Sequence, residues 1–305
     1  MTPNISVLIN LYNYGQFIAE AIDSVLAQKH PADEIIIVDD GSTDEGPQIV
    51  EEYASKHTNL KLLRKENGGQ LSCFEQGFEA SSGDIVLFLD ADDVWEPSHL
   101  ANISRAFQEN PDVDLIFTEY RKFGTANDRH TPYSKSIHLG QNIISTLFSR
   151  KYYGSITSAN AFRRQALIPL FPVTSEVRTL CRINADAWLV FGLSIFGGNS
   201  YYLSSDTVRY RIHGDNNYQN SDKNIAKRFD EVLLQRRIIE QLRVKADIPF
   251  SIKYEFHHEF ETKPSPSKRC YKQALNSLSL LNLSMIKGFK MRQRIARHYR
   301  KFGTP

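Results

Sequence analysis

The chain has 305 residues, which is enough for one α/β domain of roughly 200 to 250 residues plus an appendage. Its composition, with 41% hydrophobic and 24% charged residues, is that of an ordinary globular protein and excludes a disordered or low-complexity chain. The formal net charge is only +2, and we expect no nucleic-acid partner.

The cysteines and the lengths of the apolar runs favour the cytoplasm as the compartment of this protein. Cys73, Cys181 and Cys270 are odd in number and far apart in sequence, so we expect neither a disulfide framework nor a zinc site with closely spaced ligands. The N-terminal residues contain no basic segment followed by an apolar stretch, and no run approaches the roughly 18 apolar residues of a membrane-spanning helix. We therefore expect a cytoplasmic protein that is soluble or attached peripherally to the inner face of the membrane.

Predicted strands and helices alternate along the first 120 residues. Short, apolar, β-branched runs predict strands at 5–11, 34–38, 60–63, 85–89 and 115–117. Amphipathic stretches between them predict helices at 17–26, 46–56, 71–80 and 97–109. Repeated units of this length imply an α/β fold with a mixed, mainly parallel sheet, helices on both faces and a ligand crevice beyond the carboxyl ends of the strands.

The later part of the chain gives weaker signals. Residues 121–135 are polar and contain Gly and Pro, which predicts a loop, and residues 141–212 mix helical and strand patterns. Beyond Asn224 the pattern predicts basic helices, and residues 263–268 are the best candidate for a linker.

Acidic residues follow the predicted strand at 85–89. Asp90, Asp92 and Asp93 repel one another where a sheet offers little solvation, which favours a positive ligand. In an extended segment Asp90 and Asp92 point to the same side, so the cluster can offer oxygen ligands to Mg²⁺ or Mn²⁺ and through it hold phosphate. An Asx-turn followed by a helix cap before Pro97 is the alternative.

A second acidic cluster follows the strand at 34–38, and a parallel sheet would place it at the same cleft. One of the residues after Gly41 can cap the next helix, which leaves Asp39 and Asp40 unexplained. A carboxylate at such a strand end can accept hydrogen bonds from a nucleotide base or from ribose hydroxyls. Tyr12, just past the first strand, could provide a ring on which the base stacks. A buried core tyrosine is the alternative.

Residues 6–44 and 67–95 together resemble family 2 glycosyltransferases of the GT-A fold, which are inverting enzymes that use nucleotide diphosphosugars. The resemblance is dense over roughly the first 120 residues and continues at isolated points to about residue 217. It implies that Tyr12 and Asp40 hold the base, for which we expect uracil, and that Mn²⁺ or Mg²⁺ is the cofactor. The nucleotide-binding residues that it implies are Asn10, Tyr12, Asp39, Asp40, Asn67, Gly69, Asp90, Ala91 and Asp92.

Two later segments extend the resemblance. Residues 183–188, Ile-Asn-Ala-Asp-Ala-Trp, are similar to the segment that contains the family's catalytic base, which implies that role for Asp186; an N-cap is the alternative. Residues 210–213, Tyr-Arg-Ile-His, are similar to a segment near the diphosphate. The similarity implies that Arg211 pairs with phosphate or a carboxylate. It implies that His213 ligates the metal or forms a hydrogen bond with a phosphate oxygen, and a surface histidine is the alternative. The metal ligands that the resemblance implies are Asp92, Asp93 and His213.

Two positions depart from the family pattern. Relatives usually carry Glu where this chain has Ala185, and many carry Asn where it has Glu75. We expect Glu75 either to change the preferred sugar or to form a local ion pair.

The basic C-terminal segment predicts an amphipathic helix. After Glu261 the chain has no acidic residue, and Lys and Arg alternate with apolar side chains up to its end. Such a helix could lie on anionic lipid as a peripheral membrane contact. A solvated face, or a helix docked against the main domain, is the alternative. The residues concerned are Ile286, Lys287, Phe289, Lys290, Arg292, Arg294, Ile295, Arg297, Tyr299, Arg300 and Lys301.

The resemblance implies transfer of a hexosyl or N-acetylhexosaminyl group, with inversion, from a UDP-sugar to a hydroxyl of a glycan or lipid-linked glycan. It divides the chain into a GT-A domain at 1–220 and a basic helical extension at 221–305. Within the domain, residues 1–120 are the nucleotide-binding half and 121–220 the acceptor half. A non-catalytic nucleotide-sugar binding module is one alternative. A sugar nucleotidyltransferase is another, disfavoured because residues 11–15 lack the Lys and Arg that a triphosphate needs.

Overall fold

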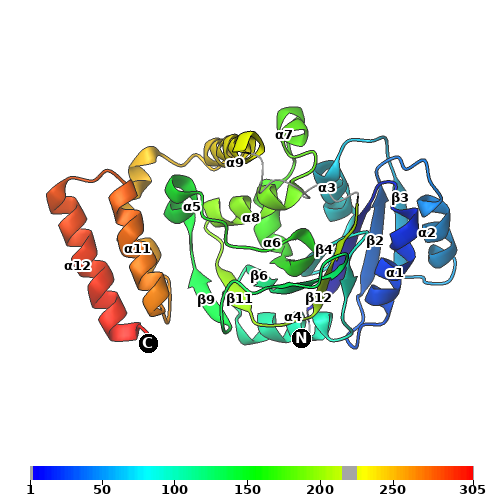
Figure 1. Cartoon of the computed structure of the whole chain (residues 1–305), viewed down its shortest axis with the longest axis horizontal. Helices are drawn as coiled ribbons and strands as arrows, with labels where there is room; N and C mark the ends of the chain where they lie inside the picture. The colour runs from blue at the N-terminus through cyan, green and yellow to red at the C-terminus, as the bar shows by residue number, and fades with distance from the viewer. Residues whose placement is uncertain (1–2, 215–224, 305) are drawn as a thin grey trace.

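A computed structural model describes residues 3–214 and 225–304 (Figure 1). A large sheet lies at the centre, helices cover it, and two long C-terminal helices stand at one end of the molecule. The N-terminus and the C-terminus both lie at the lower edge in this view. The chain thus combines the predicted α/β core with a helical C-terminal part.

The central sheet is mixed and mainly parallel, as predicted. Among the described residues its strands are β1 (Ile5–Leu11), β2 (Glu34–Asp39), β3 (Leu60–Arg64), β4 (Ile85–Asp90), β6 (Leu115–Thr118), β9 (Ile137–Gly140), β10 (Asn160–Arg163) and β11 (Ser200–Leu203). Their spatial order is β3-β2-β1-β4-β10-β6-β11-β9. β10 is antiparallel to β4 and β6, β9 is antiparallel to β11, and the other pairs are parallel.

Helices cover both faces of this sheet. They are α1 (Gly15–Leu26), α2 (Gly46–Ala54), α3 (Gln70–Ala80), α4 (His99–Glu109), α5 (Ile143–Ser149), η1 (Thr157–Ala159), α6 (Arg164–Leu167), η2 (Ile168–Leu170), α7 (Ser175–Leu180), α8 (Ala185–Ile195) and α9 (Ile225–Lys245). Successive side chains of a strand point to opposite faces. Ile9 of β1 therefore belongs to a core with α1, α2 and α4, whereas Leu8 belongs to a core with α3, α8 and α9.

A second, smaller sheet was not expected from the sequence. It contains β5 (Val94–Trp95), β7 (Tyr120–Gly124), β8 (Arg129–His130) and β12 (Val208–Ile212), in the order β5-β12-β7-β8. The prediction of a loop over 121–135 is therefore wrong where β7 and β8 lie. β7 pairs with β12 from much later in the chain, and a strand stabilised by a distant partner need not carry a local apolar pattern.

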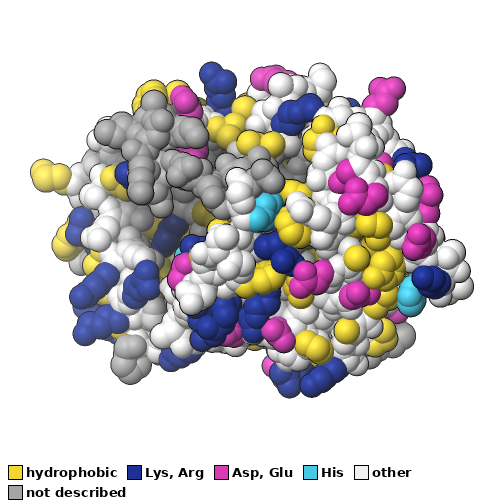
Figure 2. Space-filling view, turned by 45° about the vertical axis from the view of Figure 1, so that its right-hand side comes forward, with side chains coloured by type: hydrophobic (Ala, Val, Ile, Leu, Met, Phe, Trp, Pro, Cys, Tyr) yellow, Lys and Arg dark blue, Asp and Glu magenta, His cyan; other side chains and the backbone are white. Residues whose placement is uncertain are grey.

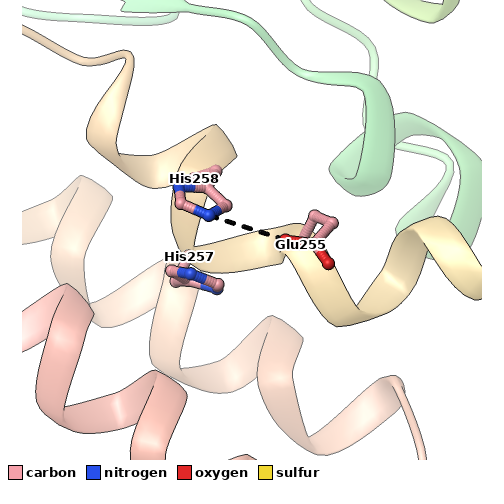
Figure 3. A group of neighbouring side chains, drawn as sticks. All are labelled: Glu255, His257 and His258. Atoms are coloured by element: carbon pink, nitrogen blue, oxygen red, sulfur yellow. Dashed lines mark ion pairs between the residues drawn. The ribbon is translucent and has the colours of Figure 1, made fainter.

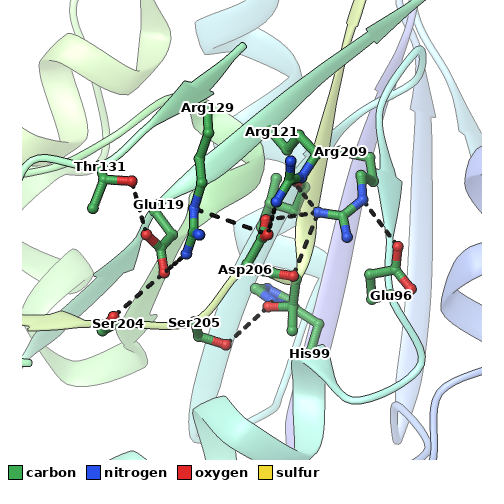
Figure 4. Close-up of polar contacts among 12 residues, drawn as sticks. Glu96, His99, Glu119, Arg121, Arg129, Thr131, Ser204, Ser205, Asp206 and Arg209 are labelled. Carbon is green, nitrogen blue, oxygen red and sulfur yellow. Dashed lines mark hydrogen bonds and ion pairs between the residues drawn. The ribbon is translucent and has the colours of Figure 1, made fainter. Parts of the chain in front are cut away.

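Ion pairs join the second sheet to Glu119, just before β7, and to the connection between β11 and β12 (Figure 4). Arg129 contacts the buried Glu119 at 2.7 Å, and Arg121 and Arg209 contact Asp206 at 2.5 and 2.9 Å. A buried carboxylate such as that of Glu119 needs partners of this kind, because an unpaired charge is costly away from water. The polar side chains that predicted a loop thus form ion pairs that stabilise β7 and β8.

The C-terminal part consists of η4 (Phe250–Glu255), α10 (Phe256–Glu261), α11 (Lys268–Leu280) and α12 (Met285–Phe302). Phe260, Leu278 and Ile295 form a third core together with Ile144 of α5. The predicted domain boundary at 220/221 lies outside the described residues, and α9, which follows it, packs into the core of the main sheet. None of the described helices is long and apolar enough to cross a membrane.

The candidate linker at 263–268 joins α10 to α11 and is anchored at its start. The buried Lys263 donates from Nζ to Asn142 Oδ1 at 2.9 Å and also contacts the Leu139 carbonyl. At its end Ser267 forms a bridge with Thr304. The segment is therefore a fixed connection within the C-terminal part.

Candidate functional site

A cavity of about 510 Å³ opens at the carboxyl ends of β1 and β4. Asn10 and Asp90 are paired in the register of these two strands, so the residues that follow them reach the same opening. Among the described lining residues Arg182 is the only basic one. The predicted residues that line the cavity are Asn10, Tyr12, Asp40, Asn67, Gly69, Asp90, Asp92 and Asp186.

Asp39 and Ala91 are buried behind the cavity wall. Asp39 accepts the Ser42 N–H at 3.0 Å, and its other oxygen lies 3.7 Å from Arg64 Nε. Asp44 accepts backbone N–H groups at the starts of α1 and α2, at 2.7 and 3.0 Å. These two carboxylates hold the turns beside the cavity, while Ala91 is fully buried.

Tyr12 and Asp40 form one end of the cavity. Tyr12 is 50% exposed and is therefore no core residue. Asp40 accepts the N–H groups of Gly68 and Gly69, both at 2.8 Å, and the Lys65 ammonium at 2.6 Å. The Asp40 carboxylate thus fixes the loop before α3 close to the Tyr12 ring.

The loop before α3 also touches the segment before α8. Gly69 has a φ of +86°, and a Cβ atom there would lie 2.5 Å from Arg182 Cγ, so this contact requires glycine. Gln70 donates from Nε2 to Asp90 at 3.0 Å and accepts the Ala185 N–H at 3.2 Å. A single side chain therefore connects the acids after β4 with the first residue of α8.

The three acids at the end of β4 and just after it have different surroundings. Asp92 Oδ2 lies 3.0 Å from His213 Nε2. Asp93 is fully buried and accepts the Ser158 hydroxyl at 2.6 Å and the Arg211 N–H at 2.9 Å. The structure therefore brings Asp92 and His213 together, Asp90 lines the same cavity as Asp92, and Asp93 is buried.

Burial, together with repulsion within this cluster, raises two pKa values. Burial, then the charges of Asp92 and Asp186, raise the pKa of Asp90 to about 7. Burial, then the neighbouring Asp92 and Asp90, hold the pKa of Asp93 well above its ordinary range. Carboxylate and imidazole groups are suitable ligands for Mn²⁺, and a cation beside them would offset the repulsion. The paired Asp92 and His213 thus have the ligand chemistry that suits a divalent ion.

Arg211 is engaged within the protein. Its Nε donates to the Asp92 carbonyl at 2.7 Å, and its guanidinium contacts Glu20. The guanidinium carbon also lies 4.9 Å from the Phe17 ring centroid and 4.3 Å from that of Phe123. These contacts hold the end of β12, and thereby His213, against the acids.

Asp186 lies in the first turn of α8, whose N-cap is Asn184. The N-cap alternative for Asp186 therefore does not apply. The Tyr152 hydroxyl donates to Asp186 Oδ2 at 2.9 Å. Burial raises the pKa of Asp186, and this hydrogen bond opposes the rise. The Asp186 side chain thus lines the cavity, and Tyr152 holds one of its oxygens.

Sequence reasoning missed Tyr152, Ser158 and Arg182, which come from the segment whose pattern could not be read. No local signal distinguishes them, because each acts through a contact with a distant part of the chain. Glu75 is buried and contacts Arg178 at 2.8 Å while accepting the Val173 N–H at 2.9 Å. Of the two expectations for Glu75, the local ion pair is the one observed.

Comparisons with known proteins agree with this architecture. Residues 6–171 match glycosyl transferase family 2. Over 222 residues the chain is 34% identical to an uncharacterized glycosyltransferase of Nostoc sp. strain PCC 7120, which covers 71% of this chain and 67% of that protein. Over 214 residues it is 28% identical to EpsH of Bacillus subtilis, named as a glycosyltransferase, which covers 70% of this chain and 62% of EpsH.

Two solved structures share the fold. TarS 1-349 of S. aureus has a TM-score of 0.57 at 17% identity and covers 98% of this chain and 91% of its own. The mannosyltransferase PcManGT of Pyrobaculum calidifontis, solved with GDP-Man and Mn²⁺, has a TM-score of 0.52 at 15% identity and covers 99% of this chain and 75% of its own. At these identities the likeness concerns the fold alone. The family match and the Nostoc relative go further, and the chain belongs to glycosyl transferase family 2, with the GT-A fold.

Proposed function

We propose that the protein transfers a hexosyl or N-acetylhexosaminyl group from a UDP-sugar to a hydroxyl of a glycan or lipid-linked glycan, with inversion at the anomeric carbon. The observation that carries the proposal is that a single cavity is lined by an exposed tyrosine, by acids after β4 and by Asp186 of α8. In this proposal the tyrosine is the stacking surface for the base, the acids form the cation site and Asp186 is the proton acceptor. Membership of the family supports sugar transfer as the reaction.

The donor would lie with its base on Tyr12. Asp40 and the loop that it fixes, including Asn67 and Gly69, would border the base and ribose. Asn10 Oδ1 is buried and has no hydrogen-bond partner among the described residues, so it can accept a ribose hydroxyl. TarS has been solved with UDP and with UDP-GlcNAc, which supports UDP as the first nucleotide to test.

Asp92 and His213 would hold the divalent ion, Mn²⁺ or Mg²⁺, close to Asp90. Asp93 remains a predicted ligand, and its contacts with Ser158 and the Arg211 backbone suit it to support the site from behind. When bound, such an ion neutralises charge on the departing diphosphate. The Mn²⁺ complex of PcManGT supports this requirement.

Asp186 would act as the base. An acceptor hydroxyl oxygen forms a bond to the anomeric carbon while the bond from that carbon to the diphosphate oxygen breaks. The hydroxyl proton passes to the Asp186 carboxylate, and the nucleoside diphosphate leaves. Tyr152 would hold the carboxylate in place through its hydrogen bond.

Release of UDP from UDP-sugars in the presence of a glycan acceptor tests this function, with NMR of the anomeric proton reporting inversion. Binding of UDP-sugars without any turnover would instead favour a non-catalytic binding module. A nucleotidyltransferase is disfavoured by the cavity, in which Arg182 is the only basic residue among those described.

We expect UDP with Mn²⁺ to raise the thermal midpoint of unfolding. A ligand that binds only the folded state stabilises it by about 2.7 kcal/mol at 100 times its Kd. Tyr12→Ala should weaken UDP binding about 5- to 150-fold, because stacking on an aromatic ring contributes about 1–3 kcal/mol per base. Thermal-shift titrations with UDP, GDP and CDP measure both effects.

Tyr12→Phe is the matched control, since it keeps the ring and loses only the hydroxyl. Tyr12 is half exposed, so neither variant should change the midpoint without ligand. A larger shift with GDP than with UDP would show that the base is wrongly assigned. Wild-type UDP affinity in Tyr12→Ala would show that Tyr12 does not contribute to the site.

Activity is expected to fall on the acidic side of its pH profile. Burial raises the pKa of Asp186 above its ordinary value of 3.8, and only the ionised carboxylate can take the proton. The Tyr152 hydrogen bond lowers this pKa, so Tyr152→Phe should move the acidic limb of kcat/KM to higher pH. Tyr53→Phe is the control, because Tyr53 donates to Asp23 far from the cavity lining, at 2.7 Å. An unchanged limb in Tyr152→Phe would contradict this role.

A further inference from the structure

The end of the hairpin formed by α11 and α12 carries exposed apolar side chains. Leu280 ends α11, and Met285, Ile286 and Phe289 lie in the first turns of α12. Their exposed fractions are 64%, 92%, 71% and 61%. These four residues are called the apolar tip below. Large apolar side chains gathered at one place on a surface mark an interaction site more often than single exposed ones do.

The apolar tip is separate from the face by which α12 docks. Met291 and Ile295 are buried in the third core, and Tyr299 stacks on Tyr271 of α11. At 100° per residue, the three tip residues of α12 fall within about 100° of one another, on the side opposite to Met291. The face of α12 that carries Met291 and Ile295 is therefore docked against the protein, as one alternative for this helix expected. The apolar tip stays exposed to solvent.

The charges around the tip are basic. Lys290 and Arg292 are exposed beside it, and no acidic residue follows Glu261 in the chain. Glu255, in the neighbouring η4, contacts His258 at 3.6 Å (Figure 3). Glu261 contacts the same histidine at 3.1 Å. Figure 2 shows apolar side chains at the edge that carries the C-terminal helices, above a group of Lys and Arg side chains. The surroundings of the tip thus suit an anionic partner.

The tip and the opening of the cavity lie toward the same edge of the molecule. Both chain ends lie at the lower edge in Figure 1, so the carboxyl end of β1 and the amino end of α12 are both directed to the upper edge. The cavity opens at the carboxyl end of β1. A flat surface that meets the tip would therefore lie at the edge toward which β1 and its cavity-lining end are directed.

We propose that the apolar tip inserts into an anionic lipid surface, with Lys290 and Arg292 against the headgroups. Apolar side chains that enter the boundary of the acyl chains, flanked by cations, are how peripheral helices bind such membranes. Each Lys or Arg near an anionic surface adds about fivefold to the affinity. This attachment does not depend on the donor, the metal or the base proposed above.

Co-sedimentation of the full chain with vesicles tests the proposal. The protein should pellet with vesicles of phosphatidylcholine and phosphatidylglycerol at low salt, and much less with phosphatidylcholine alone. The triple variant Met285→Ser, Ile286→Ser, Phe289→Ser keeps every charge and should lower the partition coefficient at least about tenfold. Lys290→Glu with Arg292→Glu should lower it about 25-fold or more, at two charges of about fivefold each.

The matched control is Ile168→Ser with Phe302→Ser, two side chains that are 48% and 44% exposed, the second at the other end of α12. This control should pellet as the wild type does. All the substituted side chains are exposed, so circular dichroism and the thermal midpoint should stay unchanged. Equal pelleting of the wild type and the triple variant, or no pelleting of the wild type with anionic vesicles, would overturn the proposal. Light scattering that shows a dimer abolished by the triple variant, without vesicle binding, would assign the tip to a second copy of the chain.

Discussion

The Asp186→Asn variant is expected to bind the nucleotide-sugar donor as the wild type does and to transfer sugar about 100- to 10,000-fold more slowly, the range attributed to a general base. The amide has nearly the shape of the carboxylate and can still accept the Tyr152 hydroxyl, but it cannot take a proton. The effect should therefore appear in kcat, while donor affinity measured by thermal shift stays the same.

Asp112→Asn is the matched control, because Asp112 is an exposed aspartate outside the cavity lining. It should transfer sugar at the wild-type rate. A near wild-type rate in Asp186→Asn would show that another group accepts the proton. Loss of donor binding in the same variant would show instead that Asp186 belongs to the donor site.

Removal of divalent cations is expected to lower transfer at least about a thousandfold, which corresponds to about 4 kcal/mol of transition-state stabilisation. Burial, and then repulsion among Asp90, Asp92 and Asp93, raise the pKa values of Asp90 and Asp93. A diphosphate adds negative charge to the same place, so both binding and departure of the leaving group should require a cation. Mg²⁺ or Mn²⁺ should restore the rate after chelation, and a monovalent salt of equal ionic strength should not.

Asp92→Asn localises this effect. It removes the carboxylate that faces His213, so half-maximal activity should require a higher Mn²⁺ concentration. Asp128→Asn is the control, since Asp128 is exposed and contacts Lys122. Full activity in chelator would remove the metal from the mechanism. An equal Mn²⁺ requirement in the two variants would assign the ion to other residues.

Much of the candidate donor site could be predicted because its signals are local. β2 and β4 are short apolar runs that end directly on acids, and parallel strands bring their carboxyl ends to one edge of the sheet. Tyr12 follows β1 in the same way. The sequence pattern could not show, however, which of Asp39 and Asp40 faces the cavity. Adjacent residues point in different directions, and the pattern does not fix which direction leads to the cavity. The structure puts Asp40 in the cavity wall and Asp39 behind it.

The rest of the site depends on contacts between distant parts of the chain. Ser158 meets Asp93 across 65 positions of sequence, and Gln70 meets Ala185 across 115. A hydroxyl or amide residue in an irregular segment has no periodicity that predicts such a partner. β7 was missed for the same reason, since its pairing with β12 and its ion pairs replace the apolar alternation that marks an isolated strand.

The position of β10 determines the order in which the site can be completed. β10 lies between β4 and β6, although its sequence follows both. As the chain leaves the ribosome, the edge of β4 stays open until residues 160–163 arrive, and Ser158 reaches Asp93 with them. Exposed strand edges of this kind are sites of misassembly. Asp93 comes early in the sequence but gains its Ser158 contact only late in synthesis. Formation of the cavity therefore depends on the insertion of β10 between β4 and β6.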